Sequence, residues 1–367
     1  MKNLLDDTTT RVKFFYNNTK KYQPVVAFFA GFTWDSFTLT RIDLVLDNLI
    51  MFSYIVLAGL FIYLYNLVEE KSLDRAFFLR YKDWYPNIIQ FFFGGLFSAY
   101  VVYYFQSASF TKNWLFVLLL ILLLVSNEFI KNRLSNFIFQ LSLYYLAVFS
   151  FFIFYLPVLF GTINAFIFII SGIVSSLFVT GLIYLLFKKL EESLRPRLKN
   201  LIIALLSIYL LFNIFYFTNM IPPVPLSLKE AGIYHDVVRE DDQYILKYEK
   251  GKWYEFFKDS DKVFHYSPGD VVFCFASVFA PTNLDTRIYH HWHYYDEIRD
   301  KWLTSDRTNY QITGGRDGGY RGYTNKRNIK PGLWRVDVEN EREQVLGSLS
   351  FEIVATRDSV QLVEITK

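Results

Sequence analysis

The sequence predicts an α-helical polytopic membrane domain with seven transmembrane helices over residues 1–221, followed by an all-β, Ig-like β-sandwich over residues 222–367. Three observations predict this fold class. Of the 367 residues, 53% are hydrophobic and 20% aromatic, which excludes a disordered chain. Long apolar stretches stop near residue 221, where the hydrophobic period changes from helical to two. The charge also changes, from 18 Lys and Arg against 12 Asp and Glu in the first unit to 20 against 23 in the second.

Six apolar stretches in the first unit approach the length of about 20 helical residues that crosses a hydrocarbon layer of ~30 Å. Residues 114–125 are apolar on every side, whereas a soluble helix would show a polar face. The six stretches are Leu44–Asn66, Asn87–Phe105, Trp114–Ile130, Asn136–Leu159, Asn164–Phe187 and Leu201–Met220.

A seventh segment, residues 24–39, is shorter and carries Asp35, whose insertion costs less near a helix end. If this segment spans, one side of the membrane receives 16 Lys and Arg and the other receives two. The 16 lie in the N-terminal tail and in the loops 67–86, 131–135 and 188–200, and the two are Arg41 and Lys112. Because basic loops stay in the cytoplasm, we expect seven crossings of the bacterial inner membrane, a cytoplasmic N-terminus and a periplasmic second unit. A re-entrant 24–39 hairpin is the alternative.

The second unit shows strand-length segments separated by Gly, Pro, Asn and Asp turns. Residues 270–279 are apolar on both faces, as expected for a central strand. Several short strands with little helix predict a β-sandwich. The predicted strands are Gln243–Tyr248, Asp270–Phe279, Thr286–Tyr295, Gly332–Glu339 and Glu343–Val354.

Standard catalytic signatures are absent from the sequence, which contains no Walker loop, H-E-x-x-H, G-x-S-x-G or dinucleotide fingerprint. We therefore predict no catalytic residue and no cofactor. The net charge of +3 argues against a nucleic-acid binder. A single cysteine, Cys274, excludes an intrachain disulfide and a thiolate metal cluster.

The run from His290 to His293 includes two pairs of side chains that a strand would place on opposite faces. His291 and His293 share a side with a spacing that suits Zn²⁺ or Cu²⁺. Additional ligands would have to come from far away in the sequence, so we interpret these two as surface histidines and predict no metal site. We interpret His290 and Trp292 as a packed core pair, with ligand binding as the alternative. The distant histidines are His235 and His265.

Four charged residues gather where the first two apolar segments meet at the outer surface: Asp35, Arg41, Asp43 and Asp47. Charges this close to lipid usually pair with one another. An ion pair between Arg41 and an aspartate is the structural interpretation of this membrane polar cluster, and a path for protons or substrate is the functional one.

The segment Gly314–Thr324 combines five glycines with charged and aromatic side chains. Its glycines permit positive φ and close approach to a ligand, guanidinium groups can hold a carboxylate or phosphate, and tyrosine rings suit sugars. The functional hypothesis is a recognition loop. The structural alternative is an internal salt bridge with tyrosines packed on the sandwich. The candidate ligand-binding residues are Arg316, Asp317, Tyr320, Arg321 and Tyr323.

Several segments resemble a bacterial family of polytopic membrane proteins with a C-terminal domain of unknown function (DUF2914-like). The likeness covers most of the second unit and part of the first, and it implies fold and location but no catalytic residue. The segments are residues 222–235, 274–282, 290–292, 314–324 and 332–338, together with 31–37 and 39–43.

These observations predict an integral inner-membrane protein that presents a non-catalytic β-sandwich to the cell envelope, where it binds a ligand, a glycan or another protein. The lipid bilayer is its other partner, and no nucleic acid is expected. Two alternatives remain open. One is a membrane-embedded enzyme or transporter acting on lipid-linked envelope material, and the other is an assembly factor.

Overall fold

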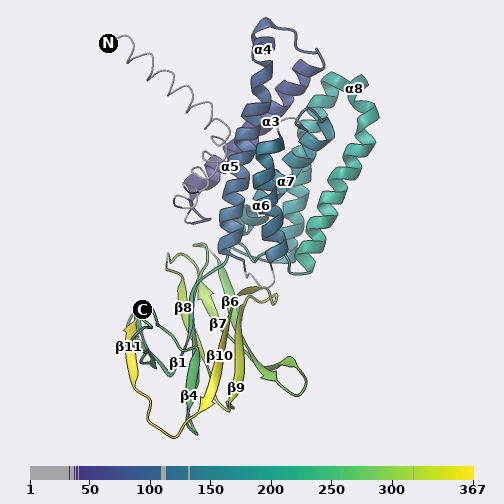
Figure 1. Ribbon diagram of the computed structural model, residues 1–367. Coiled ribbons are helices and arrows are strands. Elements are labelled where there is room, and N and C mark those ends of the chain that lie inside the picture. Colours follow the sequence, from purple (N-terminus) through teal and green to yellow (C-terminus); the bar gives the residue numbers. More distant parts are fainter. Residues whose placement is uncertain are drawn as a thin grey trace, which may run out of the picture.

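The structure is a computed structural model that describes residues 33, 37, 39 and 41–367, apart from 109–112, 131–132, 283 and 317, with the backbone alone for 127–130. An all-helical unit lies at one end of the molecule and an all-β unit at the other (Figure 1). The helices are α3 (Val45–Glu69), α4 (Ala76–Arg80), the 3-10 turn η1 (Lys82–Trp84), α5 (Tyr85–Gln106), α6 (Trp114–Ile130), α7 (Phe137–Phe160) and α8 (Ala165–Phe217).

Helix α8 is a hairpin of two arms. As a straight rod its 53 residues would extend about 80 Å, more than twice the thickness of the hydrocarbon layer. Leu190 departs from helical geometry with φ −129° and ψ 33°, and the arms fold back on each other there (Figure 1). Phe168, near the start of α8, stacks on Tyr216, near its end, with ring centroids 3.7 Å apart. The two arms therefore run antiparallel, and the predicted 188–200 loop is helical.

The helical unit is apolar enough for a membrane, but the predicted count of seven transmembrane helices is not supported. Among the described residues, four helices are long and apolar enough to cross: α3, the segment Lys82–Gln106, α7 and α8. A fifth apolar helix, Trp114–Ser126, is shorter. The count differs partly because two predicted stretches form the arms of α8. The seventh segment, residues 24–39, falls largely outside the described residues.

Several polar groups inside the bundle hydrogen bond to other helices, as a low-dielectric surrounding favours. The Tyr100 hydroxyl donates to the backbone carbonyl of Ala147 at 2.7 Å. The Asn66 amide donates to the side-chain oxygen of Gln140 at 2.7 Å. Both contacts join different helices, so they fix the packing of the bundle in addition to hiding polar atoms.

The β unit consists of three sheets, which corrects the predicted two-sheet, Ig-like sandwich. The sheet orders are β1-β5-β8, β4-β10-β9-β6-β7 and β11-β3-β2. The five predicted strands are present as β3, β5, β6, β9 and β10. The strands are β1 (Ser227–Tyr234), β2 (Asp236–Glu240), β3 (Gln243–Glu249), β4 (Val263–Tyr266), β5 (Val272–Phe279), β6 (Asp285–Asp296), β7 (Lys301–Thr313), β8 (Tyr320–Lys326), β9 (Gly332–Glu339), β10 (Val345–Ala355) and β11 (Leu362–Thr366).

Strand β5 explains why a third sheet is needed. It is the central strand of β1-β5-β8, as its two apolar faces predicted. One face places Cys274 in a core with Trp292 and Trp334 of the five-stranded sheet. The other face places Phe275 in a core with Leu246 of the β11-β3-β2 sheet. The middle sheet is therefore covered on both sides, and a two-sheet sandwich would have left Phe275 exposed.

The two units are joined by direct contacts besides the chain itself. Asn113, just before α6, donates to the backbone carbonyl of Asn219 at 3.1 Å. Asn219 in turn donates to the carbonyl of Arg342, at 3.3 Å. The Arg342 guanidinium lies 3.8 Å from the ring centroid of Tyr216 at the end of α8. The β unit is thus anchored on the end of the bundle and does not depend on a free linker.

Candidate functional site

His290 and Trp292 lie in the core. Both side chains are 0% exposed, and Nδ1 of His290 hydrogen bonds to the hydroxyl of Thr324 at 2.8 Å. Burial lowers the pKa of His290 to about 3, so the ring is neutral at physiological pH. The arrangement agrees with the packed-pair interpretation and keeps both rings out of reach of a ligand.

His291 and His293 occupy the opposite face of the five-stranded sheet, within an ion-pair network and not free on the surface. Nδ1 of His291 lies 3.3 Å from Glu339, and Nε2 of His293 lies 3.3 Å from Asp337. Each carboxylate has a second, cationic partner: Arg307 at 3.4 Å from Glu339 and Arg335 at 3.1 Å from Asp337. We name these six residues the arginine-balanced face.

The membrane polar cluster contains the predicted ion pair. Arg41 contacts Asp43 through two hydrogen bonds of 2.9 and 2.7 Å. The same carboxylate accepts from the backbone N–H and the hydroxyl of Thr282, at 3.3 and 3.2 Å, so it ties the start of α3 to the β5–β6 turn. Asp47 lies in the first turn of α3, and Asp35 is outside the described residues.

A cavity of about 490 Å³ lies beside this ion pair, between α3, α7 and the β5–β6 turn. Asp43 is the residue of the membrane polar cluster that lines it. Its walls are otherwise mainly apolar: Val45, Leu49 and Phe52 of α3, Tyr155, Val158 and Leu159 of α7, and Pro281 of the turn, with Asn48 and Thr282 at the polar side.

The start of the Gly314–Thr324 segment packs against the same β5–β6 turn, and from Tyr320 onward the segment forms β8, beside β5. A Cβ on Gly314 would lie 1.6 Å from the carbonyl oxygen of Pro281, so this position requires glycine. Gly319 has φ +85°, and a Cβ at this position would lie 2.6 Å from the hydroxyl oxygen of Ser277. Gly314 therefore allows close backbone packing on the turn that contacts Asp43, and Gly319 allows close packing on the end of β5.

Those charged and aromatic residues of this segment that the structure describes contact different parts of the β unit and do not all converge on one point. Arg321 donates to the carbonyl of Asp242 at 2.7 Å and lies over the ring of Tyr244. Arg316 is exposed and lies 5.5 Å from the Tyr320 ring centroid. Tyr323 packs edge-on against Tyr244. Asp317 is outside the described residues.

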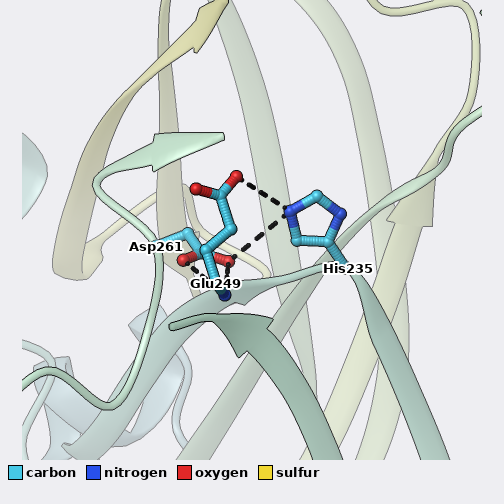
Figure 2. Close-up of side chains that lie close together, drawn as sticks. All are labelled: His235, Glu249 and Asp261. Atoms are coloured by element: carbon cyan, nitrogen blue, oxygen red, sulfur yellow. Dashed lines mark hydrogen bonds and ion pairs between the residues drawn. The ribbon is translucent and has the colours of Figure 1, made fainter. Parts of the chain in front are cut away.

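A second histidine–carboxylate cluster was missed by the sequence reasoning: His235, Glu249 and Asp261 (Figure 2). His235 sits between β1 and β2, Glu249 ends β3, and Asp261 precedes β4. One possible metal-ligand atom of each residue lies within 4.8 Å of those of the other two. In the described part of the chain, no other group of three or more His, Cys, Asp or Glu residues has its ligand atoms this close together. Stacking on Phe264, with ring centroids 3.9 Å apart, fixes the His235 ring.

The pKa values of the two carboxylates in this cluster shift in opposite directions. Burial works to raise the pKa of Glu249, but hydrogen bonds from His235 and His265 outweigh it and lower the pKa to about 2. Burial raises the pKa of Asp261 above its ordinary value, against the opposing effect of the Lys258 ammonium at 3.0 Å. The cluster therefore holds an ionised carboxylate, Glu249, beside Asp261, whose anionic form is disfavoured by burial.

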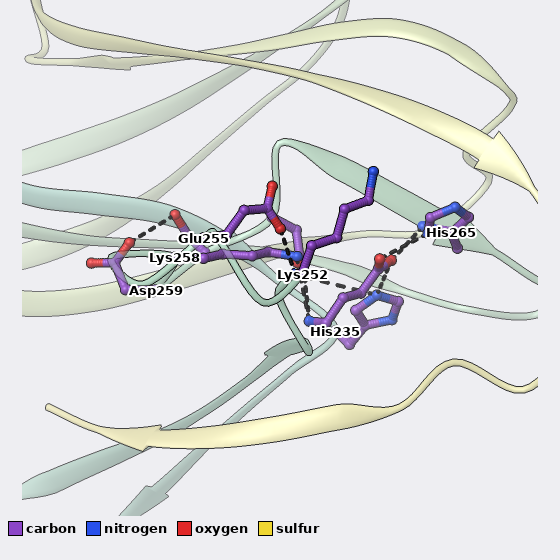
Figure 3. Close-up of polar contacts among 9 residues, drawn as sticks. His235, Lys252, Glu255, Lys258, Asp259 and His265 are labelled. Atoms are coloured by element: carbon purple, nitrogen blue, oxygen red, sulfur yellow. Dashed lines mark hydrogen bonds and ion pairs between the residues drawn. The ribbon is translucent and has the colours of Figure 1, made fainter.

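The cluster borders a groove with a volume of about 420 Å³. Glu249 and His265 form one wall, and His265 donates to Glu249 through both its backbone N–H, at 2.6 Å, and Nδ1, at 2.7 Å (Figure 3). Hydroxyl, amide and carboxylate groups of the segment before β11 form the other wall: Thr356, Asp358, Ser359 and Gln361.

An aromatic loop leaves this groove at Gly251. Trp253, Phe256 and Phe257 are 85%, 81% and 97% exposed, and Tyr254 beside them is 55% exposed. Large aromatic side chains that stay in water in this number mark an interaction surface. A sequence signal existed in the run Trp253-Tyr-Glu-Phe-Phe257, which has neither strand nor helix periodicity.

Comparisons with known proteins give one family match. Residues 285–353, from β6 into β10, match the family described as "Protein of unknown function (DUF2914)", which supports the resemblance for this C-terminal part. No curated protein matches the chain significantly. Among solved structures, the alkylpurine DNA glycosylase AlkC of Pseudomonas fluorescens, bound to DNA containing an abasic site analog, aligns with 10% identity over 77% of this chain and 82% of that chain. Its TM-score of 0.19 is too low to carry an argument. The chain is thus similar to the DUF2914 family over residues 285–353.

Proposed function

We propose that the chain is a non-catalytic bacterial inner-membrane protein that presents its β unit on the outer face. The arrangement of charge supports this orientation. The basic segments around α4 and around the turn of α8 lie at the end of the bundle that is remote from the β unit (Figure 1). Basic loops stay in the cytoplasm, so the opposite end, with the β unit, faces outward. The N-terminal tail, with five further basic residues, is then cytoplasmic if residues 24–39 cross.

We further propose that the β unit binds a polysaccharide chain of the envelope in the groove beside Glu249. The observation that carries this proposal is the combination of a polar groove with an exposed aromatic loop. Hydroxyl, amide and carboxylate groups match the hydroxyl groups of sugars, and aromatic rings offer flat apolar faces to the sugar ring. The recognition loop proposed from the sequence, Gly314–Thr324, becomes on this account a support for the membrane-facing turn.

A binding assay with the full-length chain in detergent tests the polysaccharide. Purified peptidoglycan sacculi and anionic capsular polysaccharide would be incubated with the wild type and with Trp253→Ala and Phe257→Ala. We expect the wild type to sediment with at least one of them and each variant to lose most of that binding. The matched control is Ile298→Ala, which removes a side chain that is also 97% exposed but lies in the β6–β7 turn. Equal binding by all four proteins, or none by the wild type, would refute the proposal.

A second candidate, action on lipid-linked envelope material, is favoured by the cavity of about 490 Å³ between α3 and α7. Apolar walls suit acyl or isoprenoid chains, and the Arg41 guanidinium that Asp43 holds beside the cavity can meet an anionic headgroup. Arg41→Gln tests it: photo-crosslinking of an isoprenoid phosphate to wild-type protein should fall in the variant. Labelling that is equal in the two proteins would remove this candidate.

A further inference from the structure

We infer that His235, Glu249 and Asp261 bind a divalent transition-metal ion of the Zn²⁺ type. This inference goes beyond the proposed polysaccharide binding and does not depend on it. An imidazole with two carboxylates is a donor set that Zn²⁺ accepts, and three protein ligands leave a fourth position for water.

The three facing atoms have the spacing of metal ligands. Nε2 of His235 lies 3.1 Å from Oε1 of Glu249 and 3.8 Å from Oδ2 of Asp261. With Zn–N and Zn–O bonds of about 2.0–2.2 Å, the ligand atoms of a tetrahedral site lie about 3.4 Å apart. The two distances from His235 fall on either side of this value, and all three ligand atoms lie within 4.8 Å of one another, so small side-chain shifts would bring them around an ion.

Both oxygens of each carboxylate are oriented by hydrogen bonds, and the oxygen nearer to His235 keeps a second lone pair for an ion. Oε1 of Glu249 accepts from the backbone N–H of His265 at 2.6 Å, and Oδ2 of Asp261 accepts from the backbone N–H of Glu249 at 3.2 Å. Oε2 of Glu249 accepts from Nδ1 of His265 at 2.7 Å. Oδ1 of Asp261 accepts from Lys258 at 3.0 Å and from the backbone N–H of Glu249 at 3.0 Å. Such outer hydrogen bonds orient the ligands of known metal sites. They hold this site in its geometry before an ion arrives, and the stacked ring of Phe264 does the same for His235.

The charge of the cluster also calls for a cation. Both carboxylates are less than one-tenth exposed. Among the described residues, Asp261 has the Lys258 ammonium at 3.0 Å, whereas Glu249 is paired with the imidazoles of His235 and His265. The ion would take the place of the proton that Nε2 of His235 otherwise shares with Glu249. Because Glu249 lines the groove, an ion has a route from solvent to the site.

Metal analysis of the tag-free full-length chain in detergent tests the inference. After removal of metals with a chelator and titration with Zn²⁺ at pH 7.5, we expect one equivalent to bind with a Kd below about 1 µM. His235→Ala and Asp261→Asn should each weaken binding at least about tenfold, and Asp261→Asn keeps the size of the side chain and an acceptor for the Glu249 N–H. The matched control His291→Ala, from the arginine-balanced face, should bind Zn²⁺ as the wild type does. No stoichiometric binding, or binding that survives both ligand variants, would overturn the inference.

X-ray absorption of the Zn²⁺-loaded wild type gives a test that does not require a folded variant. One imidazole with oxygen ligands is expected at the metal. Two imidazoles would instead indicate the His291–His293 pair, whose rings lie 4.0 Å apart, and would contradict the assignment.

Discussion

The β unit contains two clusters with the same chemical ingredients, histidine and two buried carboxylates, arranged in opposite ways. On the arginine-balanced face, Glu339 and Asp337 each have one histidine and one arginine partner. Their contacts therefore form two separate pairs along the sheet. In the second cluster, the three ligand atoms of His235, Glu249 and Asp261 converge within 4.8 Å.

The difference teaches how to distinguish a structural network from a site. A carboxylate whose two oxygens already face a histidine and an arginine has its charge balanced and gains little from an added ion. A convergent pair of carboxylates with one lysine is short of positive charge. Residue type alone would have favoured the first cluster, because His291 and His293 are close in sequence, whereas geometry favours the second.

The largest loss of stability is expected when a carboxylate of the arginine-balanced face is removed. Asp337→Ala leaves Arg335 and His293 without their carboxylate in a mostly buried position, so the free energy of unfolding should fall by about 3 kcal/mol. Denaturant unfolding of the full-length chain in detergent measures it, with the exposed Glu341→Ala as control at under about 0.5 kcal/mol. Equal, small effects of the two substitutions would show that the face is solvated and unimportant for stability.

A pH-dependent loss is expected from the second cluster. The pKa of Glu249 falls from 4.5 to about 2 in the folded protein, so its contribution to stability is fully present above pH 4.5 and is lost as pH falls toward 2. Glu249→Gln lacks this titration and should be less stable than the wild type by about 1–3 kcal/mol at pH 7. The difference in unfolding free energy between the wild type and Glu249→Gln should become smaller below pH 4.5. A gap that stays constant between pH 7 and 3 would contradict the ionised, hydrogen-bonded carboxylate.

A smaller effect is expected from His291→Ala. Glu339 keeps Arg307 as a partner, so the loss should be about 1 kcal/mol of unfolding free energy. Thermal unfolding with and without Zn²⁺ separates the clusters further. A stabilisation by Zn²⁺ of about 5 °C at a hundredfold excess over Kd should persist in this variant and disappear in His235→Ala. If instead His291→Ala removes the Zn²⁺ effect, the roles of the two clusters are reversed.

The smallest effect on stability belongs to the aromatic loop. Phe257 is 97% exposed, so Phe257→Ala should change the free energy of unfolding by less than about 0.5 kcal/mol. Calorimetry or denaturant unfolding beside the polysaccharide assay checks it. A loss above 1.5 kcal/mol would show that the ring packs within the fold, and the loop would then lose its interpretation as a binding surface.

The long apolar helices were predicted, although their count was not, because their signal is local. Stretches that are apolar on every side identify helices whatever their partners, and Asn136–Leu159 corresponds to α7 within one residue at each end. The 188–200 segment was predicted as a loop because of its charges. It contains Lys, Glu and Leu, which favour helix, and charged side chains do not interrupt a helix that has left the apolar layer.

The β unit was predicted in part, for the opposite reason. Strands with a buried face show alternation, whereas β7 has one buried residue, Ile312, and about half of its residues are exposed, so its hydrophobic pattern is weak. The candidate site was missed because it requires tertiary structure. The β2–β3 hairpin and the parallel pairing of β4 with β10 bring His235, Glu249 and Asp261 together. Their spacings of 14 and 12 residues match no metal motif of the kind readable from sequence.

Thiol labelling of intact cells tests most directly the claim that the β unit faces outward. Cys274, the only cysteine of the sequence, is 0% exposed, and burial raises the pKa of its thiol, so the natural chain gives a low background. Phe257→Cys places a thiol in the exposed aromatic loop, and Trp84→Cys places one at η1, next to α4 at the far end of the bundle (Figure 1). With a membrane-impermeant maleimide applied to cells whose outer membrane has been opened, we predict labelling of Phe257→Cys at once and of Trp84→Cys only after lysis. Labelling of Trp84→Cys in intact cells, with Phe257→Cys protected, would contradict the account.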